Sequence, residues 1–260
     1  MKKILFVGLV LIGLVSQAQT TDLIHDNHAQ LRKVGSFTAI KVSSAIDLYL
    51  TQSNACQVAV SASKEEYRDK IITEVDGGTL IIKIDNHDGW FNWKNWGDQK
   101  AKAYVSVKDL DALTASGASN VRLVNKIESP KLKIKLSGAS DLKGDILAGN
   151  ISVEVSGASD YKGQLEAKNL VIDGSGASKV ELNGKVDDLS VEVSGASDAK
   201  LYNLIAKGAI VHASGASNAN VNVSQLLKVQ ASGASNINYK GDASIKEMSN
   251  SGASNIRHKN

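Results

Sequence analysis

The chain has 260 residues and a formal net charge of +3, from 30 Lys and Arg residues against 27 Asp and Glu residues. A nearly neutral chain whose basic residues do not cluster lacks the electrostatic features of proteins that bind nucleic acid or anionic membranes. Cys56 is the only cysteine, which excludes an intramolecular disulfide and favours a small, buried apolar side chain over a reactive thiol.

Residues 1–18 have the features of a signal peptide. Lys2 and Lys3 precede an apolar stretch from Ile4 to Val15, and Ser16-Gln17-Ala18 places small residues at the two positions that signal peptidase reads. The stretch is shorter than the about 20 residues that a transmembrane helix needs, and no later segment is apolar enough to span a membrane. We therefore expect an exported protein that begins near Gln19 and resides in the periplasm, on the outer cell surface or in the medium.

Residues 19–33 are predicted to form a flexible N-terminal segment. Its two histidines, His25 and His28, have no third ligand nearby, so no metal site is expected. No nucleotide fingerprint, phosphate loop or Cys/His cluster occurs in the chain, and we expect no cofactor.

Residues 34–115 are predicted to be a less regular β region. Val42 to Asp47 resembles a degenerate copy of a motif that recurs later, and Lys64 to Ile71 favours two helical turns. Asp76-Gly77-Gly78 indicates a turn before a strand over Thr79 to Ile84, and another strand is expected over Lys102 to Val107. An irregular start suits a stack of coils, because its end needs a cap against end-to-end association.

A polar and aromatic insertion, residues 86–100, interrupts this region. It contains Trp90, Phe91, Trp93 and Trp96, including all three tryptophans of the chain. Two interpretations remain open: the rings fold down as a lid over the flank or cap, or they form an exposed aromatic platform for glycan rings or a partner protein.

From residue 116 the chain is repetitive. Eight copies of Ser-Gly-Ala-Ser succeed one another in steps of 18 to 21 residues, beginning at Ser116, Ser137, Ser156, Ser175, Ser194, Ser214, Ser232 and Ser251. A nearly constant step of this size is typical of a solenoid, in which each turn stacks on the one before.

Apolar residues alternate with polar ones before each tetrapeptide, as in Leu132, Ile134 and Leu136, which predicts a half-buried strand. The parity of the apolar positions changes across the tetrapeptide, which indicates a corner where Gly adopts positive φ. We expect the third residue, always Ala, to fill the inside of this corner and the serines to form ladders outside. The predicted fold is all-β: a right-handed parallel β-helix with coils of about 19 residues, continuous over residues 34–260 and regular over 116–260.

Three features together resemble the bacterial family of putative auto-transporter adhesins with a head GIN domain, which are exported β-helical proteins. They are Phe37-x-x-Ile40-x-Val42 leading into Ala45 to Leu50, the segment from Ile72 to Leu80, and the serial Ser-Gly-Ala-Ser followed by Asp or Asn. The resemblance covers about residues 34–257. It implies a β-helical fold and export, and it assigns no residue a catalytic or binding role.

The residue after each tetrapeptide is predicted to form a polar column. Three interpretations of the column are open: a solvated ladder whose side chains bond the local backbone, a cation site at Asp141 and Asp160, or an acid/base cluster of Asp160, Lys179 and Asp198. Its members are Asn120, Asp141, Asp160, Lys179, Asp198, Asn218, Asn236 and Asn255.

These observations favour an exported, cell-envelope β-solenoid that acts as a non-enzymatic, adhesin-like binding module or as a structural module. Its expected partner is a glycan or a cell-surface protein. The alternative is a carbohydrate-active enzyme, a polysaccharide lyase or hydrolase, that uses the face carrying Asp160, Lys179 and Asp198.

Overall fold

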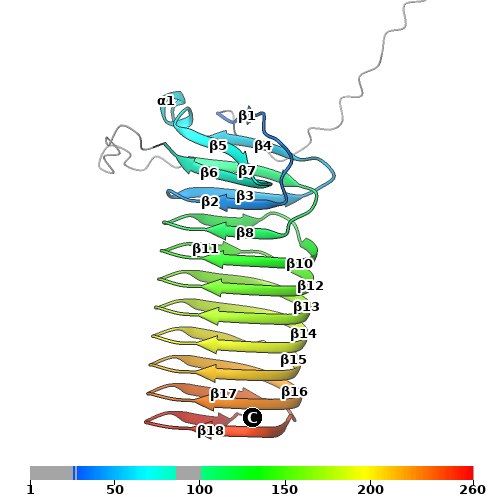
Figure 1. Cartoon of the computed structure of the whole chain (residues 1–260), viewed down its shortest axis with the longest axis vertical. Helices are drawn as coiled ribbons and strands as arrows, with labels where there is room; N and C mark the ends of the chain where they lie inside the picture. The colour runs from blue at the N-terminus through cyan, green and yellow to red at the C-terminus, as the bar shows by residue number, and fades with distance from the viewer. Residues whose placement is uncertain (1–25, 27, 86–100, 260) are drawn as a thin grey trace, which may run out of the picture.

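The structure is a computed structural model that describes residue 26, residues 28–85 and residues 101–259. These residues form one 19-stranded sheet that winds into a solenoid, its coils stacked along a single long axis (Figure 1). The predicted parallel β-helix with coils of about 19 residues is confirmed, while its right-handed winding stays a prediction. The predicted signal peptide and the Trp-rich insertion lie outside the described residues. Within them, no helix has the length and apolar character needed to cross a membrane.

The regular part is built from parallel strands, each paired with the strand one coil away. Leu132, for example, lies opposite Ile151, which lies opposite Leu170, so like residues stack on like. The strands are β8 (Ala112–Ala115), β9 (Asn120–Leu123), β10 (Ile127–Leu136), β11 (Asp141–Lys143), β12 (Ile146–Val155), β13 (Asp160–Gly174), β14 (Lys179–Val193), β15 (Asp198–Ala213), β16 (Asn218–Ala231), β17 (Asn236–Lys240), β18 (Ser244–Asn250) and β19 (Asn255–His258).

The interior is one continuous apolar column, whose buried residues lie between Phe37 and Tyr239 in the chain. The predicted alternation places it there: Ile134 and Leu136 are fully buried, whereas Lys133 faces solvent. Because every coil repeats this pattern in register, the buried side chains of one coil cover those of the next, and the hydrophobic effect stabilises the whole stack.

Each Ser-Gly-Ala-Ser tetrapeptide forms the predicted corner. The glycines have φ between 68° and 77° in all eight copies. The copies also approach one another closely, because a Cβ on Gly138 would lie 2.4 Å from the carbonyl oxygen of Gly117. Glycine is therefore required both by its conformation and by the space between neighbouring coils.

The prediction of which corner residues face inward and which face outward is wrong. The Ala in the third place is exposed, as at Ala177, and the second Ser is buried, as at Ser178 with 2% exposure. The turn takes Gly and Ala out of the core, so the chain re-enters it at the second Ser. A small hydroxyl suits that position because it bonds the turn itself: Ser140 Oγ donates to the carbonyl of Ser137 at 2.9 Å.

The N-terminal part supplies two more coils, and their stacking order differs from their order in the chain. β2 and β3 form a coil that lies between the coil of β6 and β7 and the coil of β8 and β9. The N–H of Ser116 donates to the carbonyl of Val42 at 3.0 Å, so the degenerate motif at 42–47 occupies a corner position. The elements are β1 (Gln30–Arg32), β2 (Ala39–Val42), β3 (Ile46–Gln52), β4 (Gln57–Ser61), α1 (Glu65–Arg68), β5 (Ile71–Asp76), β6 (Thr79–Ile84) and β7 (Ala101–Val107).

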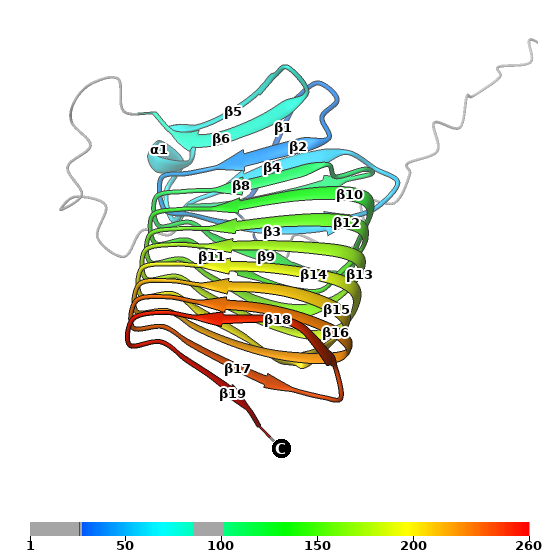
Figure 2. The same cartoon turned by 60° about the horizontal axis from the view of Figure 1, so that its bottom comes forward.

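The top of the stack changes strand direction. β4 runs antiparallel to β7, β1 runs antiparallel to β4, and β5 runs antiparallel to β6 through the predicted turn at Gly77 and Gly78 (Figure 2). The predicted helical turns shorten to the four residues of α1. Cys56 is exposed, contrary to the prediction, because it lies in the turn between β3 and β4 and not on the inward side of a strand.

Candidate functional site

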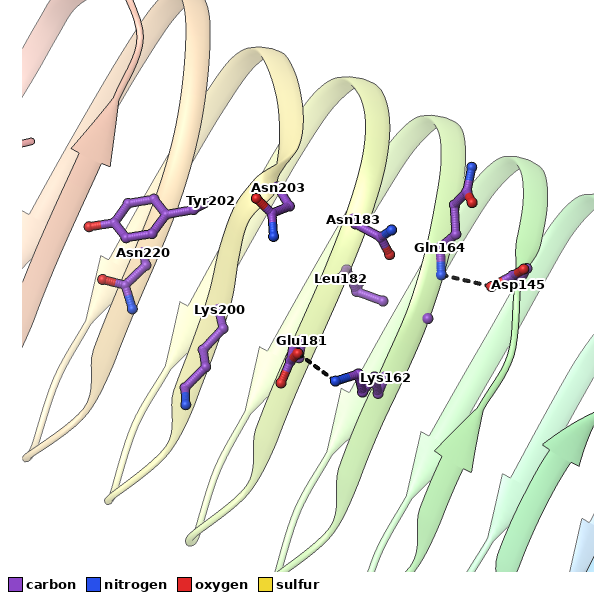
Figure 3. A pocket seen from close by; sticks show the side chains of 11 residues that line it. Asp145, Lys162, Gln164, Glu181, Leu182, Asn183, Lys200, Tyr202, Asn203 and Asn220 are labelled. Carbon is purple, nitrogen blue, oxygen red and sulfur yellow. Dashed lines mark hydrogen bonds and ion pairs between the residues drawn. The ribbon is translucent and has the colours of Figure 1, made fainter. Parts of the chain in front are cut away.

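One face of the solenoid is hollowed across several successive coils. It is formed by the strands that follow each corner, from β3 through β9 and β11 to the first residues of β13, β14, β15 and β16. Three depressions of about 310, 200 and 630 Å³ adjoin there. The first two share Asp141 and Lys143, and the last two share Lys162 and Glu181, so we treat them as one feature and call it the axial groove. Figure 3 shows the largest of the three depressions.

Two columns of outward side chains form the floor of the axial groove. Alternate residues of a strand point to the same face, so the residue after each tetrapeptide and the residue two places further both face outward. Parallel pairing in register stacks them coil upon coil. The first column is the predicted one, and the second consists of Arg122, Lys143, Lys162, Glu181, Lys200, Asn220 and Asn238.

The first column has the predicted stacking, with Asp141, Asp160, Lys179 and Asp198 on successive coils. Its neighbours are joined by hydrogen bonds: Asn120 Nδ2 donates to Asp47 Oδ1 at 2.7 Å, and Asn218 Nδ2 donates to Asp198 Oδ1 at 2.8 Å. These contacts are those of a polar ladder.

Lys179 does not join the neighbouring aspartates as an acid/base group would. Its ammonium pairs with Glu181 at 3.2 Å, and Lys162 reaches the same carboxylate at 2.8 Å. Hydrogen bonds from Lys162 and, to a smaller extent, from Lys179 lower the pKa of Glu181 and keep its carboxylate ionised. In the part of the chain that the structure describes, no three His, Cys, Asp or Glu side chains are grouped so as to hold a metal ion.

The charges that line the axial groove balance. Five acidic residues (Asp47, Asp141, Asp145, Asp160, Glu181) face five basic ones (Arg122, Lys143, Lys162, Lys179, Lys200), so the lining has a formal net charge of zero. Across residues 28–85 and 101–259, no ion pair within 4.0 Å is formed by Arg122, Lys143 or Lys200, which leaves their donors available to a ligand.

The largest depression adds neutral groups. Gln164, Asn183, Asn203 and Asn220 place amides around it, and Tyr202 places an aromatic ring at its edge (Figure 3). The Tyr202 ring lies 4.9 Å from the Lys240 ammonium, and partial burial raises the pKa of its hydroxyl, which therefore stays a neutral donor and acceptor. A second ring, Tyr49, lies at the other end of the groove and stacks on Tyr104 with ring centroids 5.2 Å apart.

Sequence reasoning found the first column and missed the second. The signal was present, because strand alternation implies that the residue two places after each predicted column member shares its face. Tyr202 was also missed, since it lies within an irregularity in the pairing of β15 with β14, between Lys200 and Asn203. The predicted aromatic site (Trp90, Phe91, Trp93, Trp96) lies outside the described residues, between β6 and β7 in the chain.

A family described as "Putative auto-transporter adhesin, head GIN domain" matches residues 36–243. Several solved structures share the fold. One, named a putative lipid binding protein, comes from Parabacteroides distasonis and is 21% identical, with a TM-score of 0.81 over 89% of this chain and 96% of that chain. A putative adhesin from Parabacteroides merdae is 18% identical, with a TM-score of 0.77 over 89% and 95% of the two chains.

A putative adhesin from Bacteroides fragilis is more distant in shape, with 20% identity and a TM-score of 0.67 over 89% of this chain and 96% of that chain. No curated protein sequence matches the chain significantly. At these identities the solved structures show the fold alone.

Proposed function

Because the chain belongs to the family described as putative auto-transporter adhesin, head GIN domain, we propose that it is an exported, non-enzymatic binding module whose axial groove holds an extended glycan. The observation that carries this proposal is the groove itself: a polar, open depression shared by successive coils along one face. The signal-peptide features of residues 1–18 support export.

The balanced lining favours an uncharged, hydroxyl-rich ligand. A sugar hydroxyl both donates and accepts hydrogen bonds, and the groove offers carboxylates, ammonium groups and amides in alternation. A polyanion would meet as many carboxylates as cations. An acyl chain would find few apolar walls, since ligand sites for apolar molecules are lined mainly by hydrophobic side chains.

The repeat of the solenoid suits a polymer. Equivalent positions recur about every 4.8 Å along the axis, which is the spacing of paired strands. A chain of sugar rings lying along the groove would therefore meet polar side chains at each coil. Tyr49 and Tyr202, near the two ends of the groove, are rings of the kind that stack on sugars. Since Tyr104 covers one face of Tyr49 and the Lys240 ammonium lies over the Tyr202 ring, a sugar would contact the other face of each.

The enzymatic alternative is less well supported by the geometry. An acid/base pair needs groups free to exchange a proton with substrate. Of the three residues suggested for it, Lys179 is engaged by Glu181 and Asp198 accepts from Asn218.

The proposal is tested by screening the purified protein against uncharged and charged bacterial and host glycans. We expect binding to uncharged glycans that varies little with salt. The Tyr202→Ala variant should bind at least about tenfold more weakly, a loss of about 1.4 kcal/mol. Ile210→Ala is the matched control, because Ile210 lies on the same strand, β15, is exposed and does not line the groove.

Equal weakening by both variants would contradict the proposed site. Binding only to charged polymers, with a steep salt dependence, would contradict the ligand class. Release of shorter sugars from any polysaccharide would contradict the non-enzymatic function.

A further inference from the structure

The coils of the repeat are not all equal in length. Successive tetrapeptides lie 19 residues apart from Ser137 to Ser194, then 20 residues apart from Ser194 to Ser214 and 18 residues apart from Ser214 to Ser232. A long coil is therefore followed directly by a short one. In the structure the long coil carries β15 and the short coil carries β16.

The extra residue of the long coil forms a bulge in β15. On the side of β14, Glu181 lies opposite Lys200, whereas Asn183 lies opposite Asn203, so β15 has one residue more than β14 over this stretch. Bulges of this kind bend a strand locally and often lie beside functional sites, where they redirect a side chain.

The short coil leaves the other side of the bulge unpaired. Leu201 lies opposite Val221, and the next pair along the two strands is Ile205 with Asn222. In the part of the chain that the structure describes, residues 202–204 therefore have no partner residue on β16. The stacking of coil upon coil is interrupted at this position.

The interruption coincides with the largest depression of the axial groove. Tyr202 and Asn203 line this depression of about 630 Å³, while Leu201 and Leu204 on either side of them are fully buried (Figure 3). Ligand sites in proteins measure about 300 to 1,000 Å³. The depression at the bulge falls within that range, whereas the other two, of about 310 and 200 Å³, lie near its lower limit or below it.

Side chains of the following coils hold the bulge in a defined shape. Asn222 Nδ2 donates to the carbonyl of Tyr202 at 3.1 Å, which satisfies a carbonyl that has no β16 residue opposite it. The Lys240 ammonium lies 4.9 Å from the centre of the Tyr202 ring, a cation–π contact that fixes the ring from one side. The bulge is therefore a built feature with its own supporting contacts.

The groups that face the depression at the bulge are available to a ligand. Asn183 and Asn203 are exposed on adjacent coils, and within residues 28–85 and 101–259 their side-chain amides form no hydrogen bond. An amide both donates and accepts, as a sugar hydroxyl does. Two such amides beside the open face of the Tyr202 ring suit one sugar unit.

We propose that the bulge of β15 is a subsite for a branch of the glycan, in which a single-sugar side unit occupies the depression and Tyr202 and Asn203 determine the specificity. This inference rests on the proposed function, the binding of an extended glycan along the axial groove. The main chain of a glycan repeats and fits coils that repeat. A branch projects from the main chain and fits a position where the repeat is interrupted.

The test compares pairs of uncharged glycans that share a main chain: mannan with galactomannan, xylan with arabinoxylan, and cello-oligosaccharides with xyloglucan oligosaccharides. Isothermal titration calorimetry on the purified protein measures each affinity. We expect the branched member of at least one pair to bind about tenfold more tightly than the linear member, because two hydrogen bonds and a ring contact together supply that difference.

Three variants locate the preference. Asn203→Ala should reduce the preference for the branched member by about threefold or more, the effect of one lost hydrogen bond, and should unfold at the wild-type temperature because Asn203 is exposed. Arg122→Ala, in the depression at the other end of the groove, should weaken both members alike and keep the preference. Asn150→Ala is the matched control, because Asn150 is exposed on β12 and does not line the groove.

The outcomes separate this inference from the proposed function. Equal affinity for the two members of every pair would overturn the branch subsite and leave glycan binding in place. A preference that Asn203→Ala leaves intact, or that Asn150→Ala reduces equally, would overturn it as well. If the wild type binds no glycan of the panel, the proposed function fails and the branch subsite fails with it.

Discussion

Replacing Ser217 and its neighbour Ala216 by leucine, one at a time, tests which residue of the corner faces the core. Ser217 is fully buried, and its hydroxyl lies 2.7 Å from the carbonyl of Ser214 and 3.1 Å from that of Val193. Ala216, one residue earlier, faces solvent. The pair therefore places the same new side chain on opposite sides of one corner in the same coil.

Ser217→Leu combines two costs. Losing the hydroxyl removes a hydrogen bond worth about 1 kcal/mol, and forcing a larger side chain between stacked coils costs about 1 to 3 kcal/mol, so we expect a loss of about 2 to 4 kcal/mol. Ala216→Leu should change the free energy of unfolding by less than about 0.5 kcal/mol, as is usual for exposed positions.

Urea unfolding followed by circular dichroism measures both variants, with the midpoint as the readout and an unchanged slope as the check that the same structure unfolds. Ser217→Ala isolates the hydrogen bond and should lie between the two leucine variants. If Ala216→Leu proved the more damaging change, the corner would face the other way and this assignment would fail.

Three further changes probe other parts of the molecule. Burial raises the pKa of the Asp173 carboxyl, and repulsion from Glu192 and Glu154 raises it further. The ionised carboxylate therefore destabilises the fold above this raised pKa, and the destabilisation disappears below the ordinary pKa of 3.8. Asp173→Asn should accordingly raise the free energy of unfolding at neutral pH by less than about 0.5 kcal/mol, a small gain because the site is exposed, and this gain should disappear as the pH falls to 3.8. Urea unfolding as a function of pH measures it, and a gain that does not change with pH would refute the electrostatic cause. Tyr161→Phe should stabilise the protein by about 1 to 3 kcal/mol in urea unfolding, since no hydrogen-bond partner of its buried hydroxyl lies among the described residues, and a loss of stability would show that the hydroxyl is satisfied. If the insertion is a recognition surface, Trp93→Ala should abolish glycan or partner binding with little change in melting temperature. A loss of about 3 to 5 kcal/mol in the free energy of unfolding, with binding retained, would show instead that the insertion is a lid.

The repeat and its alternation were sufficient to predict the coil. A step of about 19 residues determines which residues stack, and period-2 alternation determines which of them enter the core, so the alignment of Leu132, Ile151 and Leu170 follows from the sequence alone. The polar column of Asp141 and Asp160 follows from the same two facts. These are local properties, and a solenoid is stabilised mainly by contacts between neighbouring coils.

The corner and the cap required the tertiary structure. Alternation shows that the apolar positions change parity across Ser-Gly-Ala-Ser, but it does not show how many residues the turn removes from the core. The structure shows a turn of two residues, which exposes Ala177 and buries Ser178. Likewise, the motif at 42–47 reveals a coil but not its position in the stack. That position depends on which free edge it meets, and pairing between strands distant in the chain decided it: β2 lies between β6 and β8 because each leaves an edge open to it.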